Sequence, residues 1–230
     1  MTTFQQKNKK IWILTAMSEE AQFIIDLYWL EKTHSLTTIS FYENAEMVLV
    51  LAGVGKVQAS IATTLLVQNY SPELLINIGI AGSLLWQDAK VWDVFLIDKI
   101  VQHDMYLPFD WSHLDYAKGA IQISFNPQLD FKDFDFTVYQ RWICLTWDQF
   151  LDDQQKVSQL RKARNAQVVE MEAFAFASVA REFWILEKIL VIKAISDGGD
   201  AEAKSAHMDN LDFAMHNSLL VLQKVVKHLI

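Results

Sequence analysis

Three acidic residues each follow a short apolar segment typical of a β-strand, an arrangement suited to acid–base chemistry. Glu20 comes soon after the apolar segment 11–16, Glu172 follows Val168-Val169, and Asp197 directly follows the segment 189–196. Open α/β sheets bind ligands at the carboxyl ends of their strands, so we expect these acids to meet at one rim. Such a set suits cleavage of a glycosidic bond: one acid protonates the leaving group, one carboxylate activates a water molecule, and negative charge stabilises the cationic sugar.

Each acid also has a structural interpretation that the sequence leaves open. Glu20 and Glu172 both fall in the first turn of a predicted helix, where a carboxylate interacts favourably with the helix dipole. Asp197 precedes Gly198-Gly199, a context typical of a turn. A carboxylic acid serves as a proton donor near neutral pH when it is buried, and the apolar residues before Asp197 favour burial there.

The order of predicted elements gives the fold class. Predicted strands cover residues 11–16, 36–42, 46–52, 74–78, 91–101, 121–125, 137–146, 168–169 and 189–196. Predicted helices cover residues 18–30, 57–69, 152–163, 173–180 and 209–229. This alternation predicts an α/β fold, a single three-layer domain at 11–230 with a mixed, mostly parallel central sheet flanked by helices. The unit at 168–196 is expected to be a right-handed crossover between parallel strands. Residues 1–10 are expected to form a flexible leader.

Composition excludes several classes of protein. The 230 residues are 52% hydrophobic and carry a net charge of −8, which disfavours nucleic acid as a partner. The polar first ten residues contain no apolar signal sequence, and no apolar run approaches the ~20 residues that a membrane span needs. We therefore expect a cytoplasmic protein with no membrane association.

The sequence predicts neither a cofactor nor a metal. Gly53 and Gly55 resemble the start of a dinucleotide fingerprint, but Gln58 stands where the third glycine belongs. The glycine pair still allows backbone N–H groups to approach an anion or a ligand. Cys144 is the only cysteine, which excludes an internal disulfide and a cysteine-based zinc site, and His103 has no second histidine at ligand spacing.

Several motifs together resemble the nucleoside phosphorylase/hydrolase superfamily, and within it the bacterial 5′-methylthioadenosine/S-adenosylhomocysteine nucleosidases. The residues that carry the resemblance are Ala16-Met17-Ser18-Glu19-Glu20, Gly53-Val54-Gly55-Lys56-Val57, Asn77-Ile78-Gly79-Ile80-Ala81-Gly82, Asp148-Gln149-Phe150, Val169-Glu170-Met171-Glu172-Ala173 and Ala194-Ile195-Ser196-Asp197. They occur in the family's order along nearly the whole chain. The last two segments are the most specific of them.

The resemblance implies catalytic roles for matching positions. Asp197 is expected to be the general acid that protonates N7 of adenine, oriented by Ser196. Glu20 is expected to bind and activate the attacking water, and Glu172 to accept hydrogen bonds from the ribose hydroxyls. Met171 is expected to pack under the ribose.

The resemblance also implies the residues that surround the base and the 5′ group. Phe150 is expected to stack on adenine while the backbone of Leu151 reads the base edge. The turn Ile80-Ala81-Gly82 is expected to line the pocket. The segment 103–111 resembles one that crosses a homodimer interface, where Leu107 and Phe109 would line the neighbouring subunit's pocket. A core-covering loop within its own subunit is the alternative.

Some residues depart from the family's pattern. Ser18, Ile80 and Ser83 differ from its usual residues, Lys193 stands where arginine is frequent, and Trp92 and Trp147 replace glycines. Ile80 and Ser83 are expected to reshape the sugar pocket, and Trp147 to narrow or tilt the base site.

The predicted reaction is hydrolysis. Phosphorylases of this superfamily hold phosphate with arginines and a glycine-rich loop. This chain instead has Met17-Ser18-Glu19-Glu20 after its first strand, and a carboxylate there repels phosphate. Two alternatives remain open: a hydrolase or phosphorylase of another purine nucleoside, such as futalosine or a deoxyadenosine derivative, and a nucleoside-binding protein without turnover.

Overall fold

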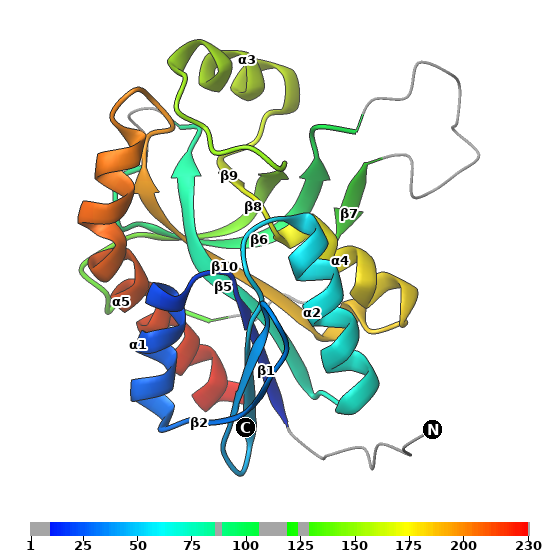
Figure 1. Cartoon of the computed structure of the whole chain (residues 1–230). Helices are drawn as coiled ribbons and strands as arrows, with labels where there is room; N and C mark the ends of the chain where they lie inside the picture. Colours follow the sequence, from blue (N-terminus) through cyan, green and yellow to red (C-terminus); the bar gives the residue numbers. More distant parts are fainter. Residues whose placement is uncertain (1–9, 86–88, 106–118, 124–128, 230) are drawn as a thin grey trace.

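The computed structural model describes residues 10–85, 89–105, 119–123 and 129–229. Its strands are β1 (Ile11–Thr15), β2 (Glu31–Ser35), β3 (Ser40–Glu43), β4 (Met47–Leu51), β5 (Leu74–Ser83), β6 (Val94–Gln102), β7 (Ala120–Gln122), β8 (Val138–Thr146), β9 (Val168–Glu170) and β10 (Ile189–Asp197). Its helices are α1 (Ser18–Tyr28), α2 (Lys56–Asn69), α3 (Gln154–Arg164), α4 (Ala173–Glu182), the short 3₁₀ helix η2 (Leu186–Lys188) and α5 (Ala203–Leu229). Helices pack on both faces of the sheet (Figure 1), so the predicted α/β class and layered arrangement are confirmed.

Strand β5 is the centre of the sheet and is buried along its whole length. It pairs in parallel with β1 on one side and with β10 on the other. The sequence predicted a strand ending at Ile78, but the segment that follows, Gly79-Ile80-Ala81-Gly82, continues the pairing with β10. The end of β5 therefore reaches the cavity, which Ile80, Ala81 and Gly82 line.

The sheet closes on itself at one end. Strands β10, β6, β8, β9 and β5 are neighbours in that order, and β10 also pairs with β5, which completes a ring. Strands β1, β4, β3 and β2 extend the sheet outward from β5. The ring and the extension together make the mixed sheet that Figure 1 shows.

The expectation of parallel strands on either side of α4 is wrong. Strand β10 is parallel to β5, whereas β9 is antiparallel to it. The reason is that β9 pairs in parallel with β8, and β8 with β6, and that group of strands runs opposite to β10. The chain runs from β8 through α3 to β9, and the parallel pairing with β8 fixes the direction of β9.

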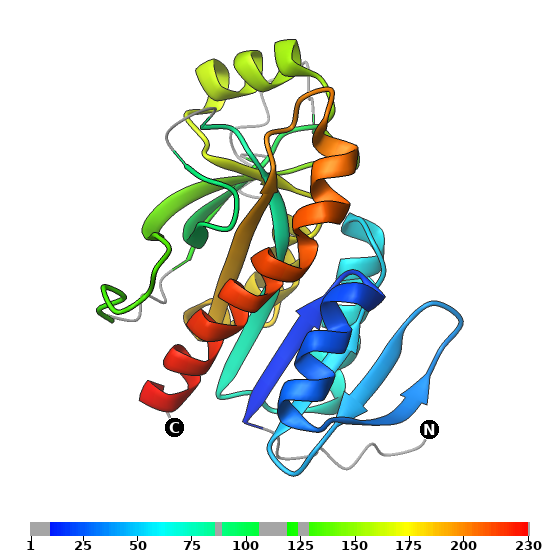
Figure 2. The ribbon, with the colours of Figure 1, turned by 90° about the vertical axis from the view of Figure 1, so that its left-hand side faces the viewer.

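Two apolar layers hold the helices to the sheet. Helices α1 and α5 lie on one face (Figure 2), and their buried residues pack with those of β1 and β5 in one core cluster. Helices α2 and α4 cover the other face through a second cluster. Helix α3 closes a smaller cluster over the ring, in which Val157 and Leu160 pack against Leu151 and Trp147.

The part of the sheet formed by β2 and β3 differs in part from the sequence-based expectation. Strand β2 was not predicted because its five residues are all exposed and show no apolar alternation. The turn expected at Glu43-Asn44 is present, and the Asn44 side chain accepts hydrogen bonds from the backbone N–H groups of Glu46 and Met47.

Helix α5 begins at Ala203, earlier than predicted. A turn leads into it, in which the backbone carbonyl of Asp200 accepts a hydrogen bond from the N–H of Ala203 at 3.0 Å. Even this longest helix carries too many polar residues for a membrane. Within the described ranges, no helix is long and apolar enough to cross one.

Candidate active site

A cavity of about 290 Å³ lies beside the carboxyl ends of β5 and β10. Many residues predicted from the sequence line it: Glu20, Ile80, Ala81, Gly82, Phe150, Leu151, Met171, Glu172 and Asp197. Others were not predicted as site residues: Ala16, Met17, Val54, Gln149, Val169, Glu170 and His207. Ser196 lies beside the cavity, bonded to Asp197, and Leu107 and Phe109 fall outside the described residues. The structure thus gathers three acids that are remote in sequence.

Glu20 is fixed by four hydrogen bonds at the start of α1. Its Oε2 accepts the Thr15 hydroxyl at 2.7 Å and the backbone N–H groups of Ala16 and Met17 at 3.1 Å each. Its Oε1 accepts the N–H of Ile80 at 2.9 Å. A Cβ on Gly79 would lie 2.6 Å from Oε1, so only glycine leaves room for the carboxylate. Glu20 is therefore more than a helix-dipole partner, since its side chain turns inward and joins β1 to β5.

Asp197 is buried at the end of β10, as the apolar residues before it predicted. Its Oδ1 accepts the backbone N–H of Gly199 at 2.9 Å, and its Oδ2 accepts the Ser196 hydroxyl at 2.7 Å. A Cβ on Gly82 would lie 3.0 Å from Oδ1. These contacts fix the carboxyl group while it still faces the cavity.

His207 lies against Asp197, whereas the sequence favoured a surface position for this residue over one above the site. Its Nδ1 lies 3.3 Å from the Ser196 hydroxyl oxygen and 3.5 Å from Asp197 Oδ2. Its ring packs edge-on against Phe150, with 5.4 Å between the ring centroids. The signal in the sequence was the place of His207 near the start of the last predicted helix.

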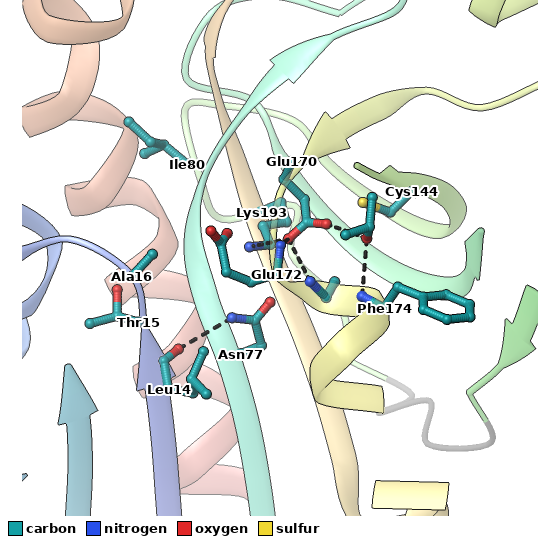
Figure 3. A network of polar contacts seen from close by, with 12 residues as sticks. Leu14, Thr15, Ala16, Asn77, Ile80, Cys144, Glu170, Glu172, Phe174 and Lys193 are labelled. Atoms are coloured by element: carbon teal, nitrogen blue, oxygen red, sulfur yellow. Dashed lines mark hydrogen bonds and ion pairs between the residues drawn. The ribbon is translucent and has the colours of Figure 1, made fainter. Parts of the chain in front are cut away.

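Glu170, which lines the cavity, forms a buried ion pair with Lys193, which is not among the lining residues. Lys193 Nζ lies 2.9 Å from Glu170 Oε2, and each side chain is 2% exposed. The same oxygen accepts the backbone N–H groups of Glu172 and Ala173, so Glu170 caps α4 (Figure 3). The Thr146 hydroxyl completes this network by donating to Glu170 and accepting from the N–H of Phe174.

The sequence did not assign this ion pair to the site. Both residues stand out separately in the sequence, Glu170 within the Val-Glu-Met-Glu motif and Lys193 as a departure from the family's arginine. Burial alone would lower the pKa of Lys193, but the negative charges of Glu170, Glu172 and Glu20 outweigh that effect and raise it. Lys193 therefore stays charged and compensates the acids around it.

Glu172 is buried beside this pair and bonded to a different helix. Its Oε1 accepts the backbone N–H of Gly55, at the start of α2, at 2.9 Å. Burial, followed by the negative charge of Glu170, raises the pKa of Glu172 to about 7. The capping role that the sequence left open for Glu172 belongs to Glu170, which leaves the Glu172 side chain directed to α2 and the cavity.

The apolar walls of the cavity come from the segments next to these acids. Phe150 is 44% exposed at the mouth, whereas Leu151 is buried. Met171 lies between the two glutamates of its motif and lines the cavity. A flat apolar ring fits between such walls, and the carboxylates can bind hydroxyl groups at its edge.

The departures from the family pattern fall in different places. Ile80 lines the cavity, whereas Ser83 and Trp147 are not among its lining residues. Trp147 is buried with Leu151 and Val169, so it supports the wall from behind and does not narrow the cavity directly. Trp92 lies on the surface with a φ of 78°, a conformation that favours the glycine it replaces.

The described side chains that line the cavity include four carboxylates and neither a lysine nor an arginine. No group of three or more histidine, cysteine or acidic side chains in the described part of the chain is arranged to hold a metal ion. The arrangement can supply a proton donor, a carboxylate that binds water and a carboxylate that binds hydroxyl groups.

Comparison with known proteins identifies relatives along almost the whole chain. The family model described as "Phosphorylase superfamily" matches residues 10–230. The 5′-methylthioadenosine/S-adenosylhomocysteine nucleosidase of Buchnera aphidicola subsp. Baizongia pistaciae is 32% identical over 235 residues, which cover 97% of this chain and 92% of that protein.

Solved structures have the same fold. The 5′-methylthioadenosine/S-adenosylhomocysteine nucleosidase of Helicobacter pylori, solved with butyl-thio-DADMe-Immucillin-A, matches with a TM-score of 0.80 and 26% identity over 96% of this chain and 98% of that one. The futalosine hydrolase of Helicobacter pylori strain 26695 matches with the same TM-score, identity and coverage of the two chains. The predicted nucleoside phosphorylase-like fold is therefore confirmed.

The first prediction concerns Gly79. Gly79→Ala places a methyl group against Glu20 Oε1, so we expect the carboxylate to shift and the free energy of unfolding to fall by about 1–3 kcal/mol. Urea denaturation and a crystal structure of the variant measure both effects. Gly198→Ala is the control, because its nearest contact is 3.3 Å away, and we expect a smaller loss there. An unmoved Glu20 with unchanged stability would contradict the packing described.

The second prediction follows from the raised pKa of Glu172. Glu172 has an ordinary pKa of 4.5 and a folded pKa of about 7, so its stabilising contribution is complete below 4.5 and is lost as pH rises through 7. Glu172→Gln removes this dependence. Between about pH 5 and pH 8, the wild type should therefore lose up to about 3 kcal/mol of unfolding free energy relative to the variant.

Urea denaturation across this pH range measures the difference. Glu31→Gln changes an exposed acid of β2 and serves as the control, which should follow the wild-type profile. Parallel profiles for wild type and Glu172→Gln would show that Glu172 titrates in the folded protein as it does in the unfolded chain.

Proposed function

This chain belongs to the phosphorylase superfamily, and we propose that it hydrolyses the N-glycosidic bond of 5′-methylthioadenosine and S-adenosylhomocysteine to release adenine. The observation that carries the proposal is the set of three buried carboxylates, Glu20, Glu172 and Asp197, around one cavity. Similarity to curated nucleosidases along nearly the whole chain supports this choice of substrates.

Asp197 is the proposed general acid. A purine anion is a poor leaving group, so the carboxylic acid protonates N7 as the bond between C1′ and N9 breaks and its electron pair moves to the base. Ser196 and the N–H of Gly199 hold the carboxyl group in place for this transfer. This assistance is typically worth ~10²–10⁴-fold in rate.

Glu20 is the proposed water ligand. Its Oε2 is occupied by three donors, whereas Oε1 accepts only the N–H of Ile80 and has capacity for one more. A water bound there attacks C1′ and gives its proton to the carboxylate. The sugar leaves with a hydroxyl group at C1′, and adenine leaves with the proton from Asp197.

Glu172 is the proposed acceptor of ribose hydroxyl groups. Its second oxygen remains available, because the bond that holds it to α2 uses Oε1. The negative charge near the ribose also stabilises the cationic sugar in the transition state. Met171 packs under the ribose, Phe150 stacks on the purine and the backbone of Leu151 reads its edge.

Water is favoured over phosphate by the contacts at the start of α2. The backbone N–H groups of Gly55 and Lys56, which an anion would otherwise occupy, already donate to Glu172 and Asp148 at 2.9 Å each. The four carboxylates on the described cavity wall oppose a further anion there. The turn that contains the glycine pair thus binds carboxylates of the protein itself and leaves these two N–H groups unavailable to phosphate.

A purine-release assay tests the proposal. The wild type should release adenine from 5′-methylthioadenosine at the same rate with and without phosphate, and Asp197→Asn should lower kcat by about 10²–10⁴-fold. Asp200→Asn, three residues further on and outside the cavity lining, is the control and should retain activity. A requirement for phosphate would indicate a phosphorylase, and full activity of Asp197→Asn would remove the proposed acid.

Hydrolysis of a different purine nucleoside is the alternative. The similarity to futalosine hydrolase and the bulky Ile80 on the cavity wall favour considering it. Futalosine and 2′-deoxyadenosine assayed beside 5′-methylthioadenosine distinguish the substrates through kcat/KM. Binding of adenine without turnover of any of them would indicate a nucleoside-binding protein.

The protein is also proposed to form a homodimer, as its resemblance implies. Val57 and Ile61 on α2 and Val54, just before it, form an apolar strip with exposed fractions of 68%, 45% and 50%, and Val54 also lines the cavity. A second subunit that covers this strip would bury it beside the site. The cytoplasmic location expected from the sequence stays a prediction.

The dimer has its own test. Light scattering with size-exclusion chromatography should give twice the chain mass for the wild type, and Val57→Asp should shift the protein toward the monomer because it places a charge within the strip. Trp184→Asp changes an 88% exposed residue outside α2 and should leave the mass unchanged. A monomeric wild type would contradict the proposal.

A further inference from the structure

Lys56 joins three segments at the rim of the cavity. Its Nζ forms an ion pair with Asp104, which follows β6, and lies 3.6 Å from Asp148 Oδ2, which follows β8. Its backbone N–H donates to Asp148 Oδ1 at 2.9 Å, and the N–H of Asp148 donates to Asp104 Oδ2 at 3.0 Å. These three residues, here called the rim clamp, form a closed ring of polar contacts.

The rim clamp adjoins the proposed ribose acceptor. Gly55, which immediately precedes Lys56, donates its N–H to Glu172 Oε1 in a buried contact. Phe150 lies two residues after Asp148 and lines the same cavity. The position of the start of α2 therefore determines where Glu172 is held, and the clamp fixes that start to two other loops.

Lys56 carries a positive charge at the N-terminus of α2, where the helix dipole disfavours a cation. Lys56 is the first residue of α2, and the positive end of the helix dipole repels a cation there. The two aspartates offset this repulsion. Partial burial would raise the pKa of Asp104, but the hydrogen bonds from Lys56 and from the N–H of Asp148 lower it below its ordinary value.

The rim clamp also differs from an ordinary surface ion pair. The side chains of Lys56 and Asp104 are 16% and 25% exposed, whereas those of Lys132 and Asp130, which form another pair, are 88% and 66% exposed. Exposed pairs contribute little, because water screens them and both side chains lose freedom. A partly buried pair with several shared contacts holds its backbone more firmly.

We propose that Lys56 is a positioning residue that acts through Gly55 to hold Glu172 in place for the ribose hydroxyl groups. The inference rests on the proposed function, since it assumes a nucleoside in the cavity. It assigns no contact between Lys56 and the substrate. Without the ammonium group, Asp104 and Asp148 repel each other, the start of α2 moves, and Glu172 loses its alignment.

The test compares substrates that do and do not bind Glu172. Removing the 2′- or 3′-hydroxyl group of 5′-methylthioadenosine should lower wild-type kcat/KM by about 10–100-fold for the hydroxyl that Glu172 accepts. We call kcat/KM for 5′-methylthioadenosine divided by kcat/KM for this deoxy analogue the hydroxyl ratio. In Lys56→Gln the ratio should be about fivefold or more smaller than in the wild type, because the hydrogen bond between Glu172 and the ribose is already weakened. Combining Lys56→Gln with Glu172→Gln should change the ratio little beyond Glu172→Gln alone.

Two further variants separate positioning from general stability. Lys132→Gln removes the exposed ion pair and should keep the wild-type ratio. Asp104→Asn weakens the clamp while keeping its shape, so it should shrink the ratio in the same direction even if Lys56→Gln does not fold. If folded Lys56→Gln or Asp104→Asn kept the wild-type ratio of kcat/KM values, this inference would be overturned while the proposed function would stand. A wild type that releases no base from any nucleoside would overturn the proposed function, and this inference with it.

Discussion

The buried ion pair between Lys193 and Glu170 makes the rest of the site possible. Four carboxylates line one cavity, and negative charges out of water oppose one another strongly. Lys193 comes from the middle of β10 and is buried below them, where it meets Glu170 at 2.9 Å. Breaking such a pair leaves an uncompensated buried charge, which typically costs about 3–5 kcal/mol.

The three glutamates of the cavity differ because their partners differ. Glu170 is bound to an ammonium group, a hydroxyl group and two backbone N–H groups, so its function is structural. Glu20 is held by donors from β1, β5 and the start of α1 and keeps one oxygen for a further partner. Glu172, bound by a single N–H of Gly55, is the one whose pKa rises to about 7. Similar side chains thus acquire separate roles from the elements that hold them.

Sequence patterns predicted the class of the fold and the residues of the motifs because both depend on local signals. Apolar segments of strand length marked β1, β9 and β10, and the acid after each could be named without a structure. The resemblance then selected among roles that periodicity left open. It could do so because Val169-Glu170-Met171-Glu172-Ala173 is a specific signal of the family.

Long-range pairing could not be predicted in the same way. The direction of β9 depends on its pairing with β8, and the Glu170–Lys193 pair depends on β5 lying between β9 and β10. The sequence favoured a surface position for His207, because the polar first turns of α5 carry no apolar periodicity. The contacts of Lys56 could not be predicted either, since its partners Asp104 and Asp148 follow strands far along the chain.

A crystal structure with an adenine-containing transition-state analogue shows whether three acids surround one bound nucleoside. We predict the Asp197 carboxyl group within about 2.6–3.2 Å of purine N7, with Glu172 on the ribose-like hydroxyl groups and Glu20 on the attacking water or its substitute. A purine bound elsewhere, or one that leaves Asp197 without contact to the base, would contradict it.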